Sequence, residues 1–197
     1  MHLMLRACAA YRGVVGLARG VTILAAFLLL ASAPLVAGKP ARDPAALRIA
    51  MLAAHNDERA ARGLGPLAWS EELVSEAAAS ATRLASEADP IAAHGKSIGG
   101  KPRGENLWTG TRGAFSFTAM AGGWLEERAF YVDGVVPNIS SSGNWADVGH
   151  YAQMIWKTTS QLGCAIASSA TEDLLVCRYD PPGNVMGRNA LTGLKGP

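Results

Sequence analysis

The stretch from Asp147 to Ala165 reads DVGHYAQMIWKTTSQLGCA and concentrates a histidine, two aromatic side chains, an amide and a cysteine. His150 opens an apolar run that extends to Trp156, which predicts a short helix holding the imidazole in a defined place. The apolar run LGCAIA at 162–167 then predicts a strand, and LLVCRYD at 174–180 predicts its partner across the turn SSATED. This part of the chain is therefore expected to form a helix followed by a β-hairpin.

The predicted hairpin can bring Cys164 and Cys177 face to face. The only other cysteine, Cys8, lies in a segment that we expect to be removed, and a remaining even pair in an exported chain favours a disulfide. A bridge over a loop of this size would stabilise the fold by about 3 kcal/mol in the chain-entropy model.

Three helices are predicted upstream of the hairpin. The first covers LRIAMLAAHNDERAARG at 47–63, after the capping residue Asp43 and Pro44 at the first helical position. His55 in this helix is interpreted as bonded to a neighbouring loop. The second follows Ser70 and ends at the Asp-Pro pair at 89–90, and the third spans 115–131. Residues 91–113 contain six glycines, all between 95 and 113, and we expect this segment to form a loop.

Glu127 stands out in the third predicted helix. At about 100° per residue it falls within the apolar stripe of Met120, Trp124 and Tyr131, whereas Glu126 points away. A carboxylate in an apolar stripe requires a cation, a metal or hydrogen-bond donors. The alternative is that Glu127 lies at a half-exposed edge of the stripe and has no special role.

The N-terminus predicts a secretory signal peptide over residues 1–38. Arginines precede the short apolar run VTILAAFLLL at 21–30, and small residues follow it, so that cleavage is expected near Ala33, Ala37 or Gly38. An uncleaved anchor is the alternative, but the run is shorter than the about 20 residues of a membrane span. Residues 39–197 would then form a single domain. The net charge of +2 comes with no basic run, which excludes a nucleic-acid surface.

Five ordered motifs give the chain a family resemblance. GHYAQMIW followed by LGCA, VCRYDPPGN, AAHNDERAARGLGPLAW, GENLW and WLEERAFY are similar to motifs of the CAP superfamily of SCP-like extracellular proteins. This superfamily includes cysteine-rich secretory, antigen-five and pathogenesis-related-one proteins. The resemblance covers about residues 47–187. It implies an α+β fold in which a three-stranded antiparallel sheet lies between helical layers as an α-β-α sandwich.

The resemblance also implies a cleft tetrad of His94, Glu105, Glu127 and His150, in which His94 and His150 bind zinc or another divalent metal. Ala152 departs from the family pattern, which usually has Thr or Ser there next to the cleft. With only two cysteines in the mature domain, the chain looks like a bacterial member.

Two functions follow from this resemblance. The first is a secreted, monomeric binding module for a lipid, sterol or protein ligand, located outside the cell or in the periplasm of a Gram-negative host. The second is a metal-dependent hydrolase, a protease or esterase, in which Glu105 or Glu127 is the candidate general base. A third possibility is that the tetrad is structural and the carboxylates only hold the imidazoles.

Overall fold

The computed structural model describes residues 42–87, 89–93 and 101–196, all within one compact unit, Gly38–Pro197. The predicted signal peptide and His94 lie outside the described residues. The helices are α1 (Pro44–Ala61), α2 (Glu71–Leu84), α3 (Pro90–Ala93), α4 (Phe117–Glu126), η1 (Glu127–Ala129), η2 (Trp145–Val148) and α5 (Gly149–Met154). The strands are β1 (Ala68–Trp69), β2 (Gly104–Thr111), β3 (Gln161–Ser168) and β4 (Glu172–Asp180).

The sheet has four strands in the order β1-β3-β4-β2, so the prediction of a three-stranded, wholly antiparallel sheet was wrong. Strands β3, β4 and β2 are antiparallel, but β1 adds two residue pairs parallel to β3. Backbone hydrogen bonds from Ala68 to Ser160 and from Ser70 to Leu162, both 2.9 Å, fix this pairing. A strand of two residues carries no alternating pattern, which is why the sequence predicted only a turn there.

Strand β2 is a second correction, because the sequence predicted a loop over residues 91–113. Gly104 and Gly110 lie within this strand because neighbouring side chains leave no room for a Cβ atom, and not because the backbone turns there. A Cβ atom at Gly104 would collide with the Gln153 side chain, and one at Gly110 would collide with the Trp108 indole. Gly residues in a strand interior often mark such close approaches. All eight residues of β2 pair with β4.

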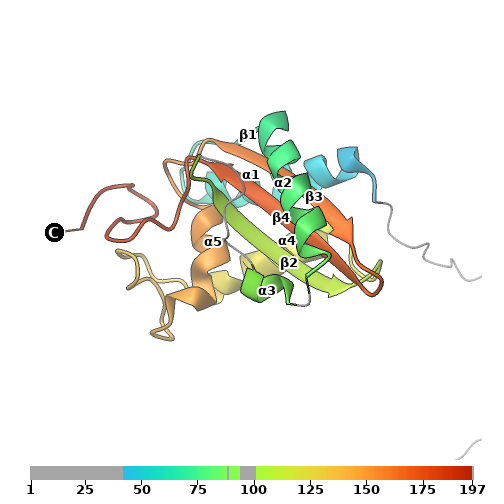
Figure 1. The fold of residues 1–197 in the computed structure, drawn as a ribbon. Helices are drawn as coiled ribbons and strands as arrows, with labels where there is room; N and C mark the ends of the chain where they lie inside the picture. The colour runs from blue at the N-terminus through green and yellow to red at the C-terminus, as the bar shows by residue number, and fades with distance from the viewer. Residues whose placement is uncertain (1–41, 88, 94–100, 197) are drawn as a thin grey trace, which may run out of the picture. The chain divides into compact units, whose positions relative to one another are not determined.

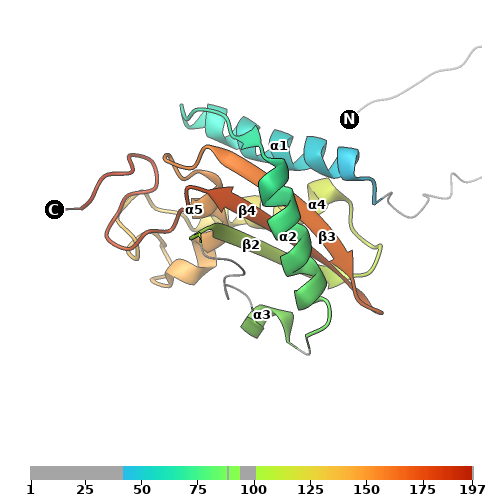
Figure 2. The same ribbon diagram turned by 45° about the horizontal axis from the view of Figure 1, so that its top comes forward.

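Helices cover both faces of the sheet (Figures 1 and 2). On one face, α2 buries Ala77, Ala81 and Leu84 against Leu174 and Val176 of β4. On the other face α1 and α4 pack on the sheet, and their contact buries the side chains Met51, Met120, Trp124, Leu162, Leu175 and Tyr179. The fold is thus mixed α+β with helices on both sides, and no helix among the described residues is long and apolar enough to span a bilayer.

Local sequence patterns predicted several of these elements correctly. Asp43 caps α1 by accepting hydrogen bonds from Ala45 N and Ala46 N, with Pro44 at the first position. Cys164 and Cys177 are directly opposed on β3 and β4 and form a disulfide. The third predicted helix is shorter than expected, because α4 ends at Glu126 and a 3-10 turn continues it.

Candidate functional site

His150 lies at the start of α5 and is held by Glu127 from the 3-10 turn η1. Its Nδ1 is 2.5 Å from Glu127 Oε1, and Glu127 Oε2 accepts a 2.9 Å hydrogen bond from the backbone N–H of Tyr151. The Glu127 side chain is 17% exposed, whereas Glu126 points to solvent. Because a carboxylate can only accept, Nδ1 carries the proton, and in a neutral imidazole Nε2 is left as an acceptor.

A second cluster fixes the turn that carries Glu127. Glu58 of α1 accepts hydrogen bonds from the Tyr151 hydroxyl at 2.6 Å and from Arg128 at 2.9 Å. Burial alone would raise the pKa of Glu58, but the hydrogen bonds from Tyr151 and Arg62 and the charge of Arg128 outweigh it and lower the pKa. Glu58 follows the helical spacing of Leu47 and Met51, as Glu127 follows its own stripe, but the sequence alone did not indicate a role for it.

A buried chain of hydrogen bonds holds the backbone of His150 from the other side. Asn106 of β2 donates from Nδ2 to the His150 carbonyl and to the Tyr179 hydroxyl, both at 3.1 Å. The Tyr179 hydroxyl lies 2.9 Å from His55 Nε2, and His55 Nδ1 lies 2.7 Å from the Met51 carbonyl. Since a carbonyl only accepts, His55 Nδ1 carries the proton and Tyr179 donates to Nε2.

This arrangement requires a neutral His55. Complete burial lowers the pKa of His55 to about 4, outweighing the hydrogen bond to Met51, and burial also raises the pKa of Tyr179. His55 is therefore bonded to a strand of the central sheet and not to a neighbouring loop as the sequence suggested.

Glu105 lines a hollow together with His150, and its carboxylate is paired with a cation. It is directly opposite Arg178 in the β2–β4 register, and the two side chains form a 2.6 Å ion pair. Both are nearly inaccessible, at 6% and 4% exposure. Arg178 also donates to Ser80 of α2 at 2.5 Å, which ties this pair to α2, whereas neighbouring Asn106 bonds to Tyr179 and His150.

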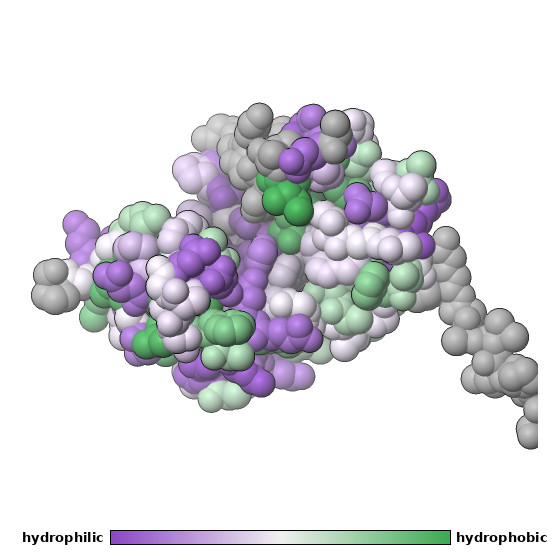
Figure 3. Space-filling view, turned by 90° about the horizontal axis from the view of Figure 1, so that it is seen from below, coloured by the Kyte–Doolittle hydropathy of each residue, from purple (hydrophilic) through white to green (hydrophobic). Residues whose placement is uncertain are grey.

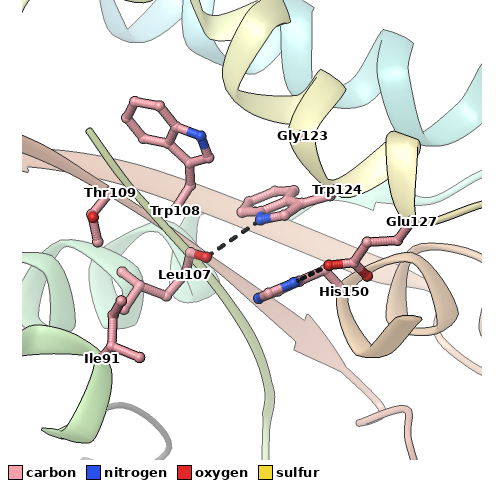
Figure 4. Close-up of a pocket in the computed structure, with 8 residues that line it drawn as sticks. All are labelled: Ile91, Leu107, Trp108, Thr109, Gly123, Trp124, Glu127 and His150. Carbon is pink, nitrogen blue, oxygen red and sulfur yellow. Dashed lines mark hydrogen bonds and ion pairs between the residues drawn. The ribbon is translucent and has the colours of Figure 1, made fainter. Parts of the chain in front are cut away.

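Two hollows share His150 and Ile91 as wall residues. The first, called here the aromatic chamber, has a volume of about 310 Å³. Its walls are Ile91, Leu107, Trp108, Thr109, Gly123, Trp124, Glu127 and His150 (Figure 4). The indole of Trp124 stacks on the His150 ring with centroids 6.0 Å apart and donates to the Leu107 carbonyl at 3.3 Å.

The second hollow, called here the polar chamber, has a volume of about 320 Å³. Its walls are Ile91, Glu105, Asn106, Trp145, Ala146, Gly149, His150 and Asn184. Figure 3 looks onto the side of the molecule where β2 and α3 lie and shows hydrophilic and apolar side chains meeting around a hollow. Ala152 lines neither chamber, because it is fully buried beside Tyr151 and Ile155, so the missing hydroxyl noted from the sequence does not alter the walls.

The described residues supply one evident metal ligand. Within these residues no group pairs with His150 Nε2, which points away from Glu127 into the chamber (Figure 4). A carboxylate on the other ring nitrogen is the usual outer partner of a metal-binding histidine. No group of three or more His, Cys, Asp or Glu in the described part of the chain is arranged to hold a metal. The second ligand implied by the resemblance, His94, lies outside that part.

Comparisons with known proteins identify the family. The model of the family described as "CAP: Cysteine-rich secretory protein family" matches residues 52–179. Pathogenesis-related protein 1C of Nicotiana tabacum is 32% identical over 139 residues, covering 70% of this chain and 77% of that protein. Pathogenesis-related protein 1 of Arabidopsis thaliana is 33% identical over 132 residues, covering 66% and 74%.

Solved structures show the same fold. A crystal structure of NaASP2 with Zn2+ matches with a TM-score of 0.59 at 22% identity, covering 79% of this chain and 88% of that one. The hookworm platelet inhibitor matches with a TM-score of 0.59 at 18% identity, covering 76% and 77%. By its motifs, its fold and these relatives, the chain belongs to the CAP, or cysteine-rich secretory protein, family.

Proposed function

We propose that this chain is an exported binding module whose ligand occupies the aromatic chamber and contacts His150. The supporting observation is the position of His150, which Glu127 and Asn106 hold at the junction of an aromatic and a polar chamber. Ligand sites are typically apolar hollows of about 300–1,000 Å³ with a few fixed polar groups. The ligand class that fits is a lipid or sterol with one polar end.

Binding is favoured over hydrolysis by the state of the two candidate general bases. A general base must accept a proton from a water or substrate within hydrogen-bonding reach. Both oxygens of Glu127 already accept hydrogen bonds, from His150 and from Tyr151 N. Glu105 is ion-paired with Arg178 and nearly inaccessible.

A divalent metal, zinc being the best match to imidazole ligands, would be held by His150 Nε2 together with His94. Bound there, the metal would supply a fixed positive charge next to His150. In this proposal Glu127 orients His150 and is not itself a ligand. Isothermal titration with zinc is expected to show one site that His150→Ala and His94→Ala each weaken.

The binding proposal is tested with the purified mature domain, a sterol and a fatty acid, measured by quenching of tryptophan fluorescence. Trp108→Ala removes one wall of the aromatic chamber and is expected to weaken binding about tenfold or more, the cost of losing a buried aromatic contact. Trp69→Ala is the matched control, because Trp69 lines a separate crevice beside α1. Equal losses in both variants would count against this site.

A parallel screen of peptide and ester hydrolysis with added zinc tests the alternative. Metal-dependent turnover that Glu127→Gln or Glu105→Gln abolishes would overturn the preference for binding. The export part of the proposal is tested by expressing the full chain and determining the N-terminus of the product. A mature N-terminus between about residues 34 and 39, in the medium or periplasm, is the expected result.

A further inference from the structure

Two adjacent glycines, Gly122 and Gly123, lie in the interior of helix α4. Glycine inside a helix costs free energy relative to alanine, because the backbone of glycine loses more conformational freedom on folding. Neither glycine has the left-handed backbone that makes this residue necessary in a turn. The conformation of the helix therefore gives no reason for glycine at these two positions.

A lack of space does not explain the two glycines either. A Cβ atom at Gly123 would lie 3.7 Å from Cδ1 and Nε1 of Trp108, which is ordinary van der Waals contact, and a Cβ at Gly122 would meet nothing within 4 Å. Gly163 on β3 is the opposite case, because a Cβ atom there would collide with the backbone of α2. An alanine side chain would thus fit at both positions of α4.

The two glycines differ in what lies in front of them. Gly123 is exposed and lines the aromatic chamber beside Trp108 (Figure 4), whereas Gly122 is half-buried and lines neither chamber. Glu127, which holds His150, follows Gly123 by four residues, so the two positions lie on the same side of the helix. Gly123 therefore leaves bare backbone in the chamber wall on the side of α4 that carries Glu127.

From these observations we infer that Gly123 determines which ligands the aromatic chamber admits. The missing side chain lets the apolar part of the ligand lie directly against the backbone of α4, and glycine is the residue that permits such a close approach. A wide, rigid ring system needs this space, whereas a narrow alkyl chain can bend around an added side chain. The inference rests on the proposed binding function and adds to it a residue that selects the ligand by its width.

Replacing each glycine in turn with Ala and with Leu tests this inference, with Gly122 as the matched control position. The probes are cholesterol, a rigid ring system, and dodecanoate, an alkyl chain, and quenching of tryptophan fluorescence measures their binding to the mature domain. Gly123→Leu is expected to weaken cholesterol binding about tenfold or more, the usual cost of an added side chain in a filled site, and to weaken dodecanoate binding less. Gly123→Ala should show a smaller loss in the same order, and the two Gly122 variants should bind both probes as the wild type does.

Urea denaturation of the same variants separates ligand selection from a need of the fold for glycine. Gly122→Ala and Gly123→Ala should both be more stable than the wild type, by similar amounts, because alanine is the better helix former. A destabilised Gly123→Ala would show that the fold requires this glycine and would overturn the inference.

The binding measurements also distinguish this inference from the proposed function. The inference alone fails if the wild type binds dodecanoate but not cholesterol, or if Gly123→Leu weakens neither probe or both probes equally. The proposed function fails with it if the wild type binds neither cholesterol nor dodecanoate.

Discussion

The hydroxyl of Tyr179 lies at the centre of the buried hydrogen-bond chain, and its removal should be costly. In Tyr179→Phe, His55 Nε2 loses the hydroxyl that donates to it at 2.9 Å, and Asn106 Nδ2 loses one of its two acceptors. All three residues are at most 1% exposed, so water cannot replace the hydroxyl without a rearrangement. Each buried group left without a partner costs about 1–3 kcal/mol, and the variant is expected to lose about 2–4 kcal/mol of unfolding free energy.

Tyr131→Phe provides a matched control for the same deleted atom. The Tyr131 hydroxyl is also buried, but it has no hydrogen-bond partner among the described residues. Removing this hydroxyl leaves no other group without a hydrogen bond, and it eliminates a buried polar atom that costs free energy. The expected change in unfolding free energy is within about 0.5 kcal/mol, or a slight gain.

Urea denaturation at neutral pH, with the disulfide intact, measures both variants against the wild type. The difference should appear as a lower midpoint for Tyr179→Phe with an unchanged slope. If the two variants lose similar amounts of unfolding free energy, or if Tyr179→Phe is neutral, the hydrogen-bond chain does not stabilise the fold.

Three further predictions concern pH, the disulfide and the buried ion pair. Burial lowers the pKa of His55 to about 4, whereas in the unfolded chain its pKa is about 6.5. Between pH 4 and pH 6.5, His55 is therefore protonated in the unfolded state but not in the folded state. Stability should therefore fall by about 3 kcal/mol as the pH drops from 6.5 to 4, and His55→Gln should flatten this part of a urea-denaturation pH profile. Replacing Cys164 and Cys177 with Ala should lower the unfolding free energy by about 3 kcal/mol in urea titrations, given their separation of 13 residues; no change would contradict the loop-entropy argument. Arg178→Met should destabilise by about 3–5 kcal/mol because it breaks a buried ion pair by removing one partner, and a smaller loss in the double variant with Glu105→Gln, measured by the same titration, would identify the ion pair as the cause.

The parts of the fold that the sequence predicted well are those set by local chemistry. Asp43 and Pro44 start α1, and the two apolar runs around Cys164 and Cys177 form a hairpin with a disulfide. Such features depend on residues a few positions apart. The inward direction of the Glu127 side chain could also be predicted, because helical geometry fixes the direction of each side chain.

The parts that the sequence missed are set by contacts between distant segments. Strand β2 exists because β4, about seventy residues later, supplies all its backbone partners, and its glycines make room for side chains that no local pattern reveals. The partner of Glu105 follows from the β2–β4 register, which places Arg178 opposite it. A resemblance to a family locates such a carboxylate along the chain but does not say which cation faces it in this particular sequence.

The place of β4 within the sheet has a consequence for how the domain assembles. This strand is the last in the chain, yet it lies between β3 and β2, and β2 pairs with no other strand in the described structure. A nascent chain that stops before Glu172 would carry β2 with an unpaired backbone, and His55 would lack Tyr179, which lies 124 residues further on. The N-terminal two-thirds of the domain therefore cannot reach its final structure ahead of the rest. Folding of the sheet therefore has to wait for the C-terminal hairpin.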